Sequence, residues 1–188
     1  MVWTVKGKRT MTDRLFFDTD CFSSFLWVHG ESVLLELFRD RIILPQQVLE
    51  ELCNPSIPHI RDKVISLMHK GDIATQQILT NTEEYELYYK MAISPPKGEL
   101  RIGRGEAAAL ALAKAHAGII ASNNMRDIDK YIKRFQLKHI TTGEILVSAL
   151  EAGLINEENG NQIWSKMISK RRLLPASSFS DYLKIRKK

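Results

Sequence analysis

Short apolar runs alternate with helix-forming segments along most of this 188-residue chain. Strands that alternate with helices in this way favour an α/β domain, in which a mainly parallel sheet carries helices on both faces. The predicted strands are residues 15–18, 41–44, 72–77, 119–122 and 138–140. The predicted helices are residues 20–29, 31–38, 46–52, 59–70, 81–91, 106–113, 125–135, 142–152 and 156–170.

The composition narrows the class of protein. The length suits one domain with a substantial core, and 44% hydrophobic with 26% charged residues is ordinary for a soluble globular protein. No apolar run approaches the roughly 18 residues of a membrane span, and residues 1–14 lack the apolar stretch of a secretory signal. Cys21 and Cys53 form no C-x-x-C pair. We therefore expect a cytoplasmic protein that does not bind membranes.

The net charge of +5 is concentrated at the two ends of the chain. Residues 1–14 are predicted to form a loose basic arm, and residues 156–188 a helix and basic tail that pack on or trail the main domain. Basic residues around an acidic centre would attract a polyphosphate chain. An ordinary solvated helix and tail would account for the same residues, and the sequence leaves both interpretations open.

Three acids stand where a parallel sheet would expose them. Asp18 ends the apolar run 15–17, Glu51 lies in the short helix after strand 41–44, and Glu106 opens the alanine-rich helix. The reactive crevice of an open α/β sheet lies beyond the carboxyl ends of its strands. Carboxylates gathered there would repel one another unless cations neutralised them, and Mg²⁺ and Mn²⁺ prefer carboxylate oxygen and water. The sequence therefore predicts a site for a divalent metal ion.

Two of these acids have acidic neighbours that compete for the same role. Asp20 is well suited to cap the helix that begins near it, which leaves Asp18, still attached to the strand, for a functional role. Glu50 and Glu51 point about 100° apart on a helix, so only one of them can face the crevice. Glu51 lies at the edge of the apolar face and is the better candidate, although either could be a surface acid.

The remaining candidates also have structural explanations. Glu106 in the first turn of a helix is stabilised by the helix dipole by roughly 0.3–1 kcal/mol. Asn124 and Asp127 resemble an N-cap and the residue three positions later. The end of strand 119–122 would nevertheless place Ser122, Asn124 and Asp127 around the same crevice, and capping is compatible with a role in the site.

Five segments, taken in order, resemble the motifs of the PIN-domain nucleases, and in particular the toxin-like bacterial and archaeal members. Residues 17–20 resemble the opening D-T-N, with Asp20 where asparagine is usual. Residues 44–52 resemble P-x-x-V-x-x-E-L, and residues 105–113 resemble G-E-A-x-A-I-x-L-A. Residues 120–127 resemble T-x-N-x-x-D, and residues 140–155 resemble the last strand and helix of the family.

The resemblance covers residues 15–155. It implies a three-layer α/β/α sandwich with a five-stranded parallel sheet, and an endonuclease that depends on Mg²⁺ or Mn²⁺. Many members carry a fourth acid directly after the threonine or serine that ends the fourth strand. Asn123 and Asn124 stand there in this chain, so Asp127 must supply that charge.

The resemblance also implies roles for individual residues. Asp18, Glu106 and Asp127 would be metal ligands, and Glu51 would complete the catalytic set and orient the attacking water. Ser122 and Asn124 would bind water or a phosphate oxygen. The remaining candidates near the site are Asp20, Glu50 and Asn123.

The partners follow from family analogy alone. RNA is favoured over DNA as the substrate. A toxin of this kind would be masked by a small antitoxin protein that inserts a basic side chain among the acids, and homodimers are typical of similar proteins.

Two other functions fit parts of the sequence. The segment Asp18–Phe22 resembles the D-x-D-x-[TV] opening of haloacid-dehalogenase-type phosphatases, but Phe22 stands where Thr or Val belongs and the later D-D motif is absent. That reaction would require Asp20 and be indifferent to Glu106. Alternatively, a PIN fold with a weakened acidic pocket could bind nucleic acid or a partner without cleaving anything.

Overall fold

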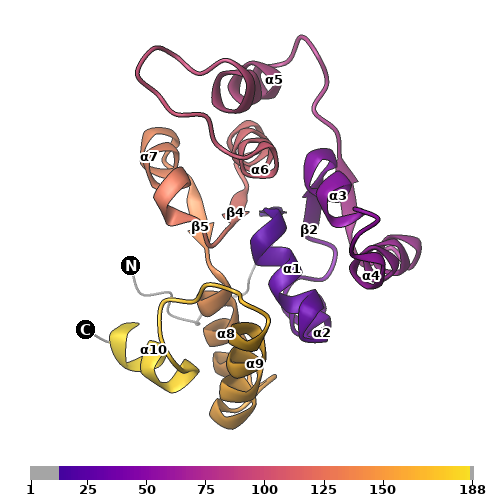
Figure 1. Ribbon diagram of the computed structural model, residues 1–188, viewed down its shortest axis with the longest axis vertical. Helices are drawn as coiled ribbons and strands as arrows, with labels where there is room; N and C mark the ends of the chain where they lie inside the picture. Colours follow the sequence, from indigo (N-terminus) through magenta and orange to yellow (C-terminus); the bar gives the residue numbers. More distant parts are fainter. Residues whose placement is uncertain (1–12, 187–188) are drawn as a thin grey trace.

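The computed structural model describes residues 13–186, so the basic arm predicted for residues 1–14 lies almost wholly outside the described residues. The five strands form one parallel sheet in the order β3-β2-β1-β4-β5 (Figure 1), which confirms the predicted sheet. Strand β1, between β2 and β4, is the centre of the sheet, so its carboxyl end lies midway along the edge at which the parallel strands end. The strands are β1 (Leu15–Phe17), β2 (Ile42–Pro45), β3 (Ala74–Gln76), β4 (Ile119–Ala121) and β5 (Lys138–Ile140).

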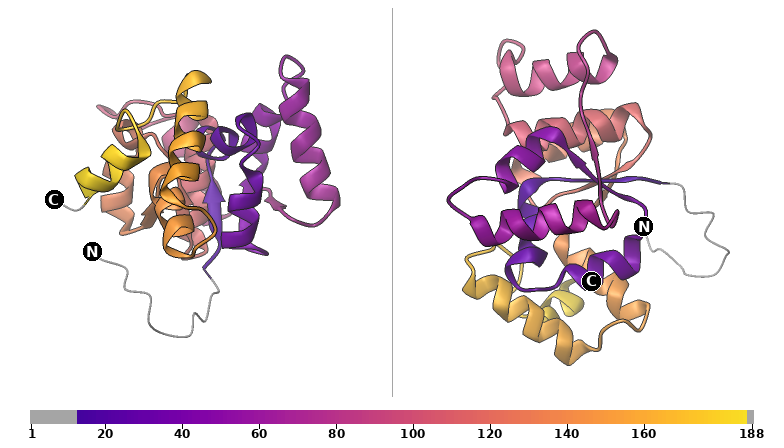
Figure 2. Two further views of the ribbon diagram at one scale, coloured as in Figure 1. Left: turned by 90° about the horizontal axis from the view of Figure 1, so that it is seen from below. Right: turned by 90° about the vertical axis from the view of Figure 1, so that its right-hand side faces the viewer.

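Side chains of β1 alternate between two hydrophobic cores, as the pleat of a strand requires. Leu15 and Phe17 belong to one core, and Phe16 belongs to the other. The three layers are visible in Figure 2, and the predicted α/β/α sandwich is confirmed. The first core is covered by α1 (Thr19–Trp27), α2 (Glu31–Phe38), α3 (Gln46–Leu52), α4 (Pro58–His69), α8 (Thr142–Glu151), α9 (Glu157–Ser169) and α10 (Phe179–Arg186). The second is covered by α5 (Glu83–Tyr88), the π-helical turn Tyr89–Ile93, α6 (Arg104–Ala115) and α7 (Met125–Phe135).

The alanine-rich helix α6 lies in the second core. Residues 107–113 have no exposed surface, and a helix that is apolar all round is a buried helix. It contacts β1, β2 and β4 on one side and α5 on the other. This burial fixes the position of Glu106, which stands in the first turn of α6.

The structure differs from the predicted elements in two places. The predicted helix 81–91 is α5, capped by Thr82, followed by a π-helical turn. Residues 179–186 were not predicted as a helix, yet they form α10, which packs on α8 and α9. Its aromatic residues lie against glycines distant in sequence: a Cβ on Gly160 would come within 2.3 Å of Phe179, and one on Gly143 within 2.6 Å of Tyr182.

No helix in the described part of the chain combines the length and apolar character needed to cross a bilayer.

Candidate functional site

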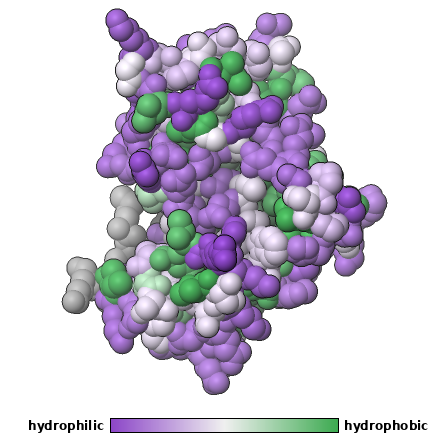
Figure 3. All heavy atoms as spheres, viewed as in Figure 1, coloured by the Kyte–Doolittle hydropathy of each residue, from purple (hydrophilic) through white to green (hydrophobic). Residues whose placement is uncertain are grey.

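A cavity of about 390 Å³ lies at the carboxyl end of β1, and residues of α1, α3, α6 and α7 line it. Hydrophilic side chains cross the middle of this face of the molecule (Figure 3). The acids Asp18, Glu51, Glu106 and Asp127, which stand far apart in the sequence, all line this one cavity. The described residues that line it are Asp18, Thr19, Asp20, Ser23, Glu51, Gly103, Gly105, Glu106, Asp127 and Arg172.

Asp18 is the N-cap of α1. Its Oδ1 accepts a hydrogen bond of 2.7 Å from the backbone N–H of Cys21. The prediction that Asp20 caps this helix is therefore wrong. The physical reason is that β1 passes into α1 with no intervening turn, so the residue directly after the strand is also the residue directly before the helix.

The second carboxylate oxygen of Asp18 is buried without a partner. The residue is only 1% exposed, and Oδ2 makes no hydrogen bond of ordinary geometry with any described residue. Burial raises the pKa of Asp18 to about 7, with smaller increases from Asp20 and Glu106, while the Ser122 hydroxyl and the Cys21 N–H lower it in part. A buried, unpaired carboxylate oxygen is unfavourable unless a proton or a cation neutralises it.

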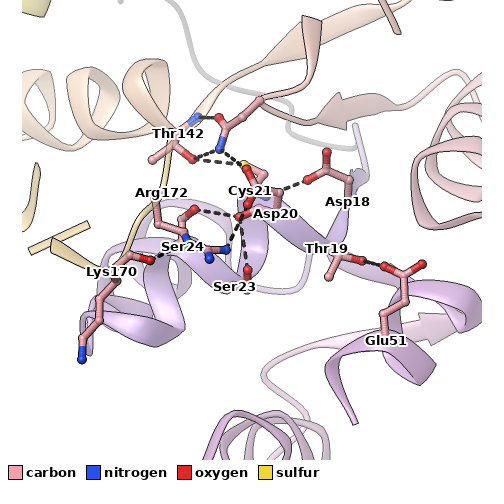
Figure 4. A network of polar contacts seen from close by, with 11 residues as sticks. Asp18, Thr19, Asp20, Cys21, Ser23, Ser24, Glu51, Thr142, Lys170 and Arg172 are labelled. Carbon is pink, nitrogen blue, oxygen red and sulfur yellow. Dashed lines mark hydrogen bonds and ion pairs between the residues drawn. The ribbon is translucent and has the colours of Figure 1, made fainter. Parts of the chain in front are cut away.

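Glu51 reaches the cavity from α3 and is held by two donors. The Thr19 hydroxyl donates to Oε2 (Figure 4), and the backbone N–H of Gly105 donates to Oε1 at 3.2 Å. These bonds join α3 to the starts of α1 and α6. Glu50, by contrast, does not line the cavity and accepts a bond from Gln46 on the same helix at 3.3 Å.

Glu106 and Asp127 share the side-chain amide of Asn124. Its Nδ2 lies 2.6 Å from Glu106 Oε1 and 2.8 Å from Asp127 Oδ2. The other oxygen of Glu106 accepts from the backbone N–H of Gly103 at 3.1 Å. Burial raises the pKa of Glu106, and Asp127 and Glu51 raise it further, while the Asn124 and Gly103 donors oppose this increase.

This arrangement corrects the predicted capping pair. Asn124 does stand at the N-cap position of α7, but its side chain makes no capping hydrogen bond. A capping asparagine would accept a backbone N–H through its Oδ1. Here the Nδ2 group is turned toward two carboxylates, whose charge makes them strong acceptors.

The other two residues at the end of β4 lie behind the cavity. Ser122 is completely buried, and its Oγ accepts from the backbone N–H of Asn124 at 3.2 Å. Asn123 forms two bonds of 2.9 Å with Thr142 at the start of α8, and its Nδ2 lies 3.5 Å from Asp20 Oδ2. Neither residue is part of the cavity lining.

Arg172 is a residue of the cavity that the site prediction missed. It belongs to the segment between α9 and α10, and its Nη1 lies 3.1 Å from Asp20 Oδ1 (Figure 4). The only signal in the sequence was the basic run 170–172 near the C-terminus, and no spacing in that run points to Asp20. Thr19 was also missed, although it stands inside the segment 17–20 that resembles a family motif.

The acids suit a divalent cation that retains water ligands. Among residues 13–186, no three Asp, Glu, His or Cys side chains are arranged so that they could hold one ion together, and the predicted set Asp18, Glu106 and Asp127 is no exception. Asp18 nevertheless lines the same cavity as Glu106 and Asp127, and its Oδ2 makes no hydrogen bond of ordinary geometry with any described residue. Mg²⁺ commonly keeps several waters and binds through one or two carboxylates, so this donor set fits such an ion.

A family model described as a PIN domain, DUF3368, matches residues 15–188. The match starts at the first residue of β1 and continues through α9 and α10, so it includes Arg172 as well as the acids. No curated protein matches the chain.

Proposed function

The chain belongs to the PIN-domain family, and from this premise we propose that it is an endonuclease that depends on Mg²⁺ or Mn²⁺ and hydrolyses phosphodiester bonds in RNA. PIN domains are generally nucleases and typically use divalent metal ions. The observation that carries the proposal is the buried, unpartnered Oδ2 of Asp18, which lies among acids at the carboxyl end of the central strand.

Asp18 and Glu106 would hold the cation, with Asp127 beside them. A bound divalent cation neutralises charge on a phosphate and promotes the ionisation of water. Asn124 keeps Glu106 and Asp127 in the cavity because its amide donates to both and offsets their repulsion. Ser122 supports this amide by accepting from the Asn124 backbone N–H.

Glu51 would orient the attacking water and accept its proton. The Thr19 hydroxyl and the Gly105 N–H fix the carboxylate in the cavity. A positioned base of this kind contributes about 10²–10⁴-fold to a rate. Glu50, one residue away on the same helix, lies outside the cavity and would have no part in the reaction.

The substrate class and the cellular role rest on family analogy. We propose RNA as the substrate, a toxin function, and a small antitoxin partner that places a basic side chain among the acids. A homodimer is proposed on the same ground. The two free cysteines are in keeping with the reducing cytoplasm that we propose as its location.

A second candidate is a nucleic-acid-binding module without catalytic activity. The absence of a three-ligand set among the described residues favours it, because a weakly held metal would give a slow enzyme or none. The phosphatase alternative receives no such support, since the family match is to a PIN domain and Asp20 is engaged by Arg172.

Glu106→Gln is expected to lower Mn²⁺-dependent cleavage at least about 100-fold, because a cation supplies several kcal/mol to the transition state and 1.36 kcal/mol is a tenfold rate change. The purified parent and the variant are incubated with a structured RNA and the matching DNA, with Mn²⁺ or with EDTA. Cleavage by the parent alone, abolished by EDTA, establishes the activity and the preferred nucleic acid. Equal cleavage by both proteins would identify a contaminant or another site. RNA binding without cleavage by a folded parent would favour the binding module.

Glu51→Gln is expected to slow cleavage at least about tenfold, while the matched variant Glu50→Gln should remain within about twofold of the parent. Both variants remove one charge from α3, so a difference between them reports the position of the carboxylate in the cavity. Initial rates on the preferred substrate provide the measurement. Similar rates for the two variants would contradict the assignment of Glu51.

A further inference from the structure

Among the described residues, Arg172 is the one basic side chain in the lining of the cavity, where it stands among five carboxylates. A phosphodiester chain that approached these acids would be repelled by each of them that is ionised. A bound cation would offset this repulsion beside Asp18 and Glu106. Asp20 lies elsewhere, at the side of the cavity next to the C-terminal segment that carries Arg172 (Figure 4). The guanidinium is therefore placed where an incoming phosphate needs a positive charge.

The backbone at the end of α9 directs Arg172 into this position. Arg171 has a left-handed conformation with φ of +58°. The N–H of Arg172 bonds the carbonyl of Met167 at 3.0 Å, and that of Arg171 bonds Ile168 at 2.8 Å. This is the pair of bonds of a Schellman turn, in which glycine usually occupies the left-handed position. The following segment is held in turn by the Trp164 indole, whose Nε1 donates to Ala176 O at 3.0 Å.

The guanidinium retains capacity for another ligand. Its Nη1 pairs with Asp20, and its Nε donates to Lys170 O at 3.2 Å, but Nη2 donates to no described residue. The side chain of Arg172 is 25% exposed and that of Asp20 is 45% exposed. A partly exposed ion pair contributes only about 0–1 kcal/mol, so it can be exchanged for a phosphate, which matches the fork of an arginine well.

We propose that Arg172 binds a backbone phosphate of the nucleic-acid substrate, and that Asp20 holds the guanidinium in the cavity until the phosphate arrives. The inference rests on the proposed function, because it assigns the group that admits the substrate strand to the same cavity. In the complex, Arg172 donates through Nη2 and Nη1 to the non-bridging oxygens of one phosphate.

Arg172→Gln is expected to weaken binding of a 12-nucleotide single-stranded RNA about tenfold, the effect of losing a charge-assisted hydrogen bond. The slope of log binding constant against log salt concentration should decrease in magnitude by about 0.7, the value for one phosphate contact on a single strand. Fluorescence anisotropy with labelled RNA in EDTA, at several salt concentrations, measures both without cleavage. Arg172→Lys should recover the slope and part of the affinity, because it keeps the charge without the fork.

Arg171→Gly is the matched control, since it removes the adjacent, exposed charge and suits the left-handed turn. It is expected to change the salt slope by less than half as much as Arg172→Gln. Thermal melting verifies that each variant is folded. An equal loss of RNA affinity and of salt slope in Arg171→Gly and Arg172→Gln would show a general effect of charge and overturn the inference. So would unchanged or tighter binding by Arg172→Gln, or a parent that binds no RNA. If the binding results hold but the parent cleaves nothing in Mn²⁺, the nuclease proposal fails and the phosphate site stands.

Discussion

Asp18→Asn is expected to reduce cleavage at least about 1,000-fold and at the same time to make the metal-free protein more stable above pH 7. The loss of activity follows because a neutral amide is a poor ligand for a hard cation and neutralises none of its charge. The gain in stability follows because Asp18 is buried with an unpartnered Oδ2, where a charge is unfavourable. Activity and stability should therefore change in opposite directions at this one position.

The effect of Asp18 on the stability of the parent protein depends on pH. Burial raises the pKa of Asp18 from 3.8 to about 7 in the folded chain, so between these values the folded state holds a proton that the unfolded state has lost. Its contribution to stability is fully present below pH 3.8 and is lost as the pH rises through 7. The free energy of unfolding that is lost when Asp18 ionises is at most roughly 4 kcal/mol, because each pH unit between the two pKa values corresponds to 1.36 kcal/mol.

Denaturant unfolding in EDTA at pH 4, 6 and 8 measures the difference in free energy of unfolding between the parent and Asp18→Asn. Near pH 4 the two proteins should be similarly stable, because a protonated carboxyl and an amide have the same shape and each leaves a donor at the position of Oδ2. The advantage of Asp18→Asn should grow to several kcal/mol by pH 8. Adding Mn²⁺ should raise the melting temperature of the parent and leave that of the variant almost unchanged.

Asp62→Asn is the control for a general effect of charge, since Asp62 is an exposed carboxylate outside the cavity. Its stability should follow that of the parent across the same range of pH. Parallel curves for Asp18→Asn and the parent would contradict the buried, unpaired state of this carboxylate.

Local sequence signals predicted the sheet and the main acids because both depend on short-range patterns. Asp18 and Glu106 could be placed because an apolar run ends at one and an alanine-rich helix begins at the other. The same local reasoning gave the helix cap to Asp20, because it could not show that the strand enters the helix without a turn. The side chain of Asn124 was assigned to its own helix for a similar reason, since Glu106, one of the two carboxylates to which its Nδ2 donates, is 18 residues away.

The C-terminal part of the site could not be predicted from local patterns. Arg172 meets Asp20 across 152 residues of chain, and its position depends on how α9 ends and how α10 returns to the domain. Of the apolar and aromatic residues of α10, Phe179 alone is fully buried. The helix is held by Phe179 and Tyr182, which lie against glycines in two other helices and against the Trp164 ring. A glycine in a sequence does not reveal which side chain lies against it.

Gly160→Ala is therefore expected to destabilise the protein, although alanine is the better helix former by about 0.8–1.0 kcal/mol. A Cβ at Gly160 would come within 2.3 Å of the Phe179 ring, which has no exposed surface. Overpacking of this kind costs about 1–3 kcal/mol. Displacing Phe179 would also loosen the segment that carries Arg172, so RNA binding should weaken in parallel with stability.

A double-mutant cycle with Phe179→Ala separates the clash from helix propensity. Phe179→Ala alone should destabilise the protein by about 3–5 kcal/mol. In that background the ring is gone, so Gly160→Ala should become stabilising by about 0.5–1 kcal/mol. This reversal of sign, measured by denaturant unfolding, is the signature of the Phe179 ring packed against Gly160 of α9. If Gly160→Ala stabilised both backgrounds, the ring would be free to move aside, and α10 would not be the element that fixes Arg172 in the cavity.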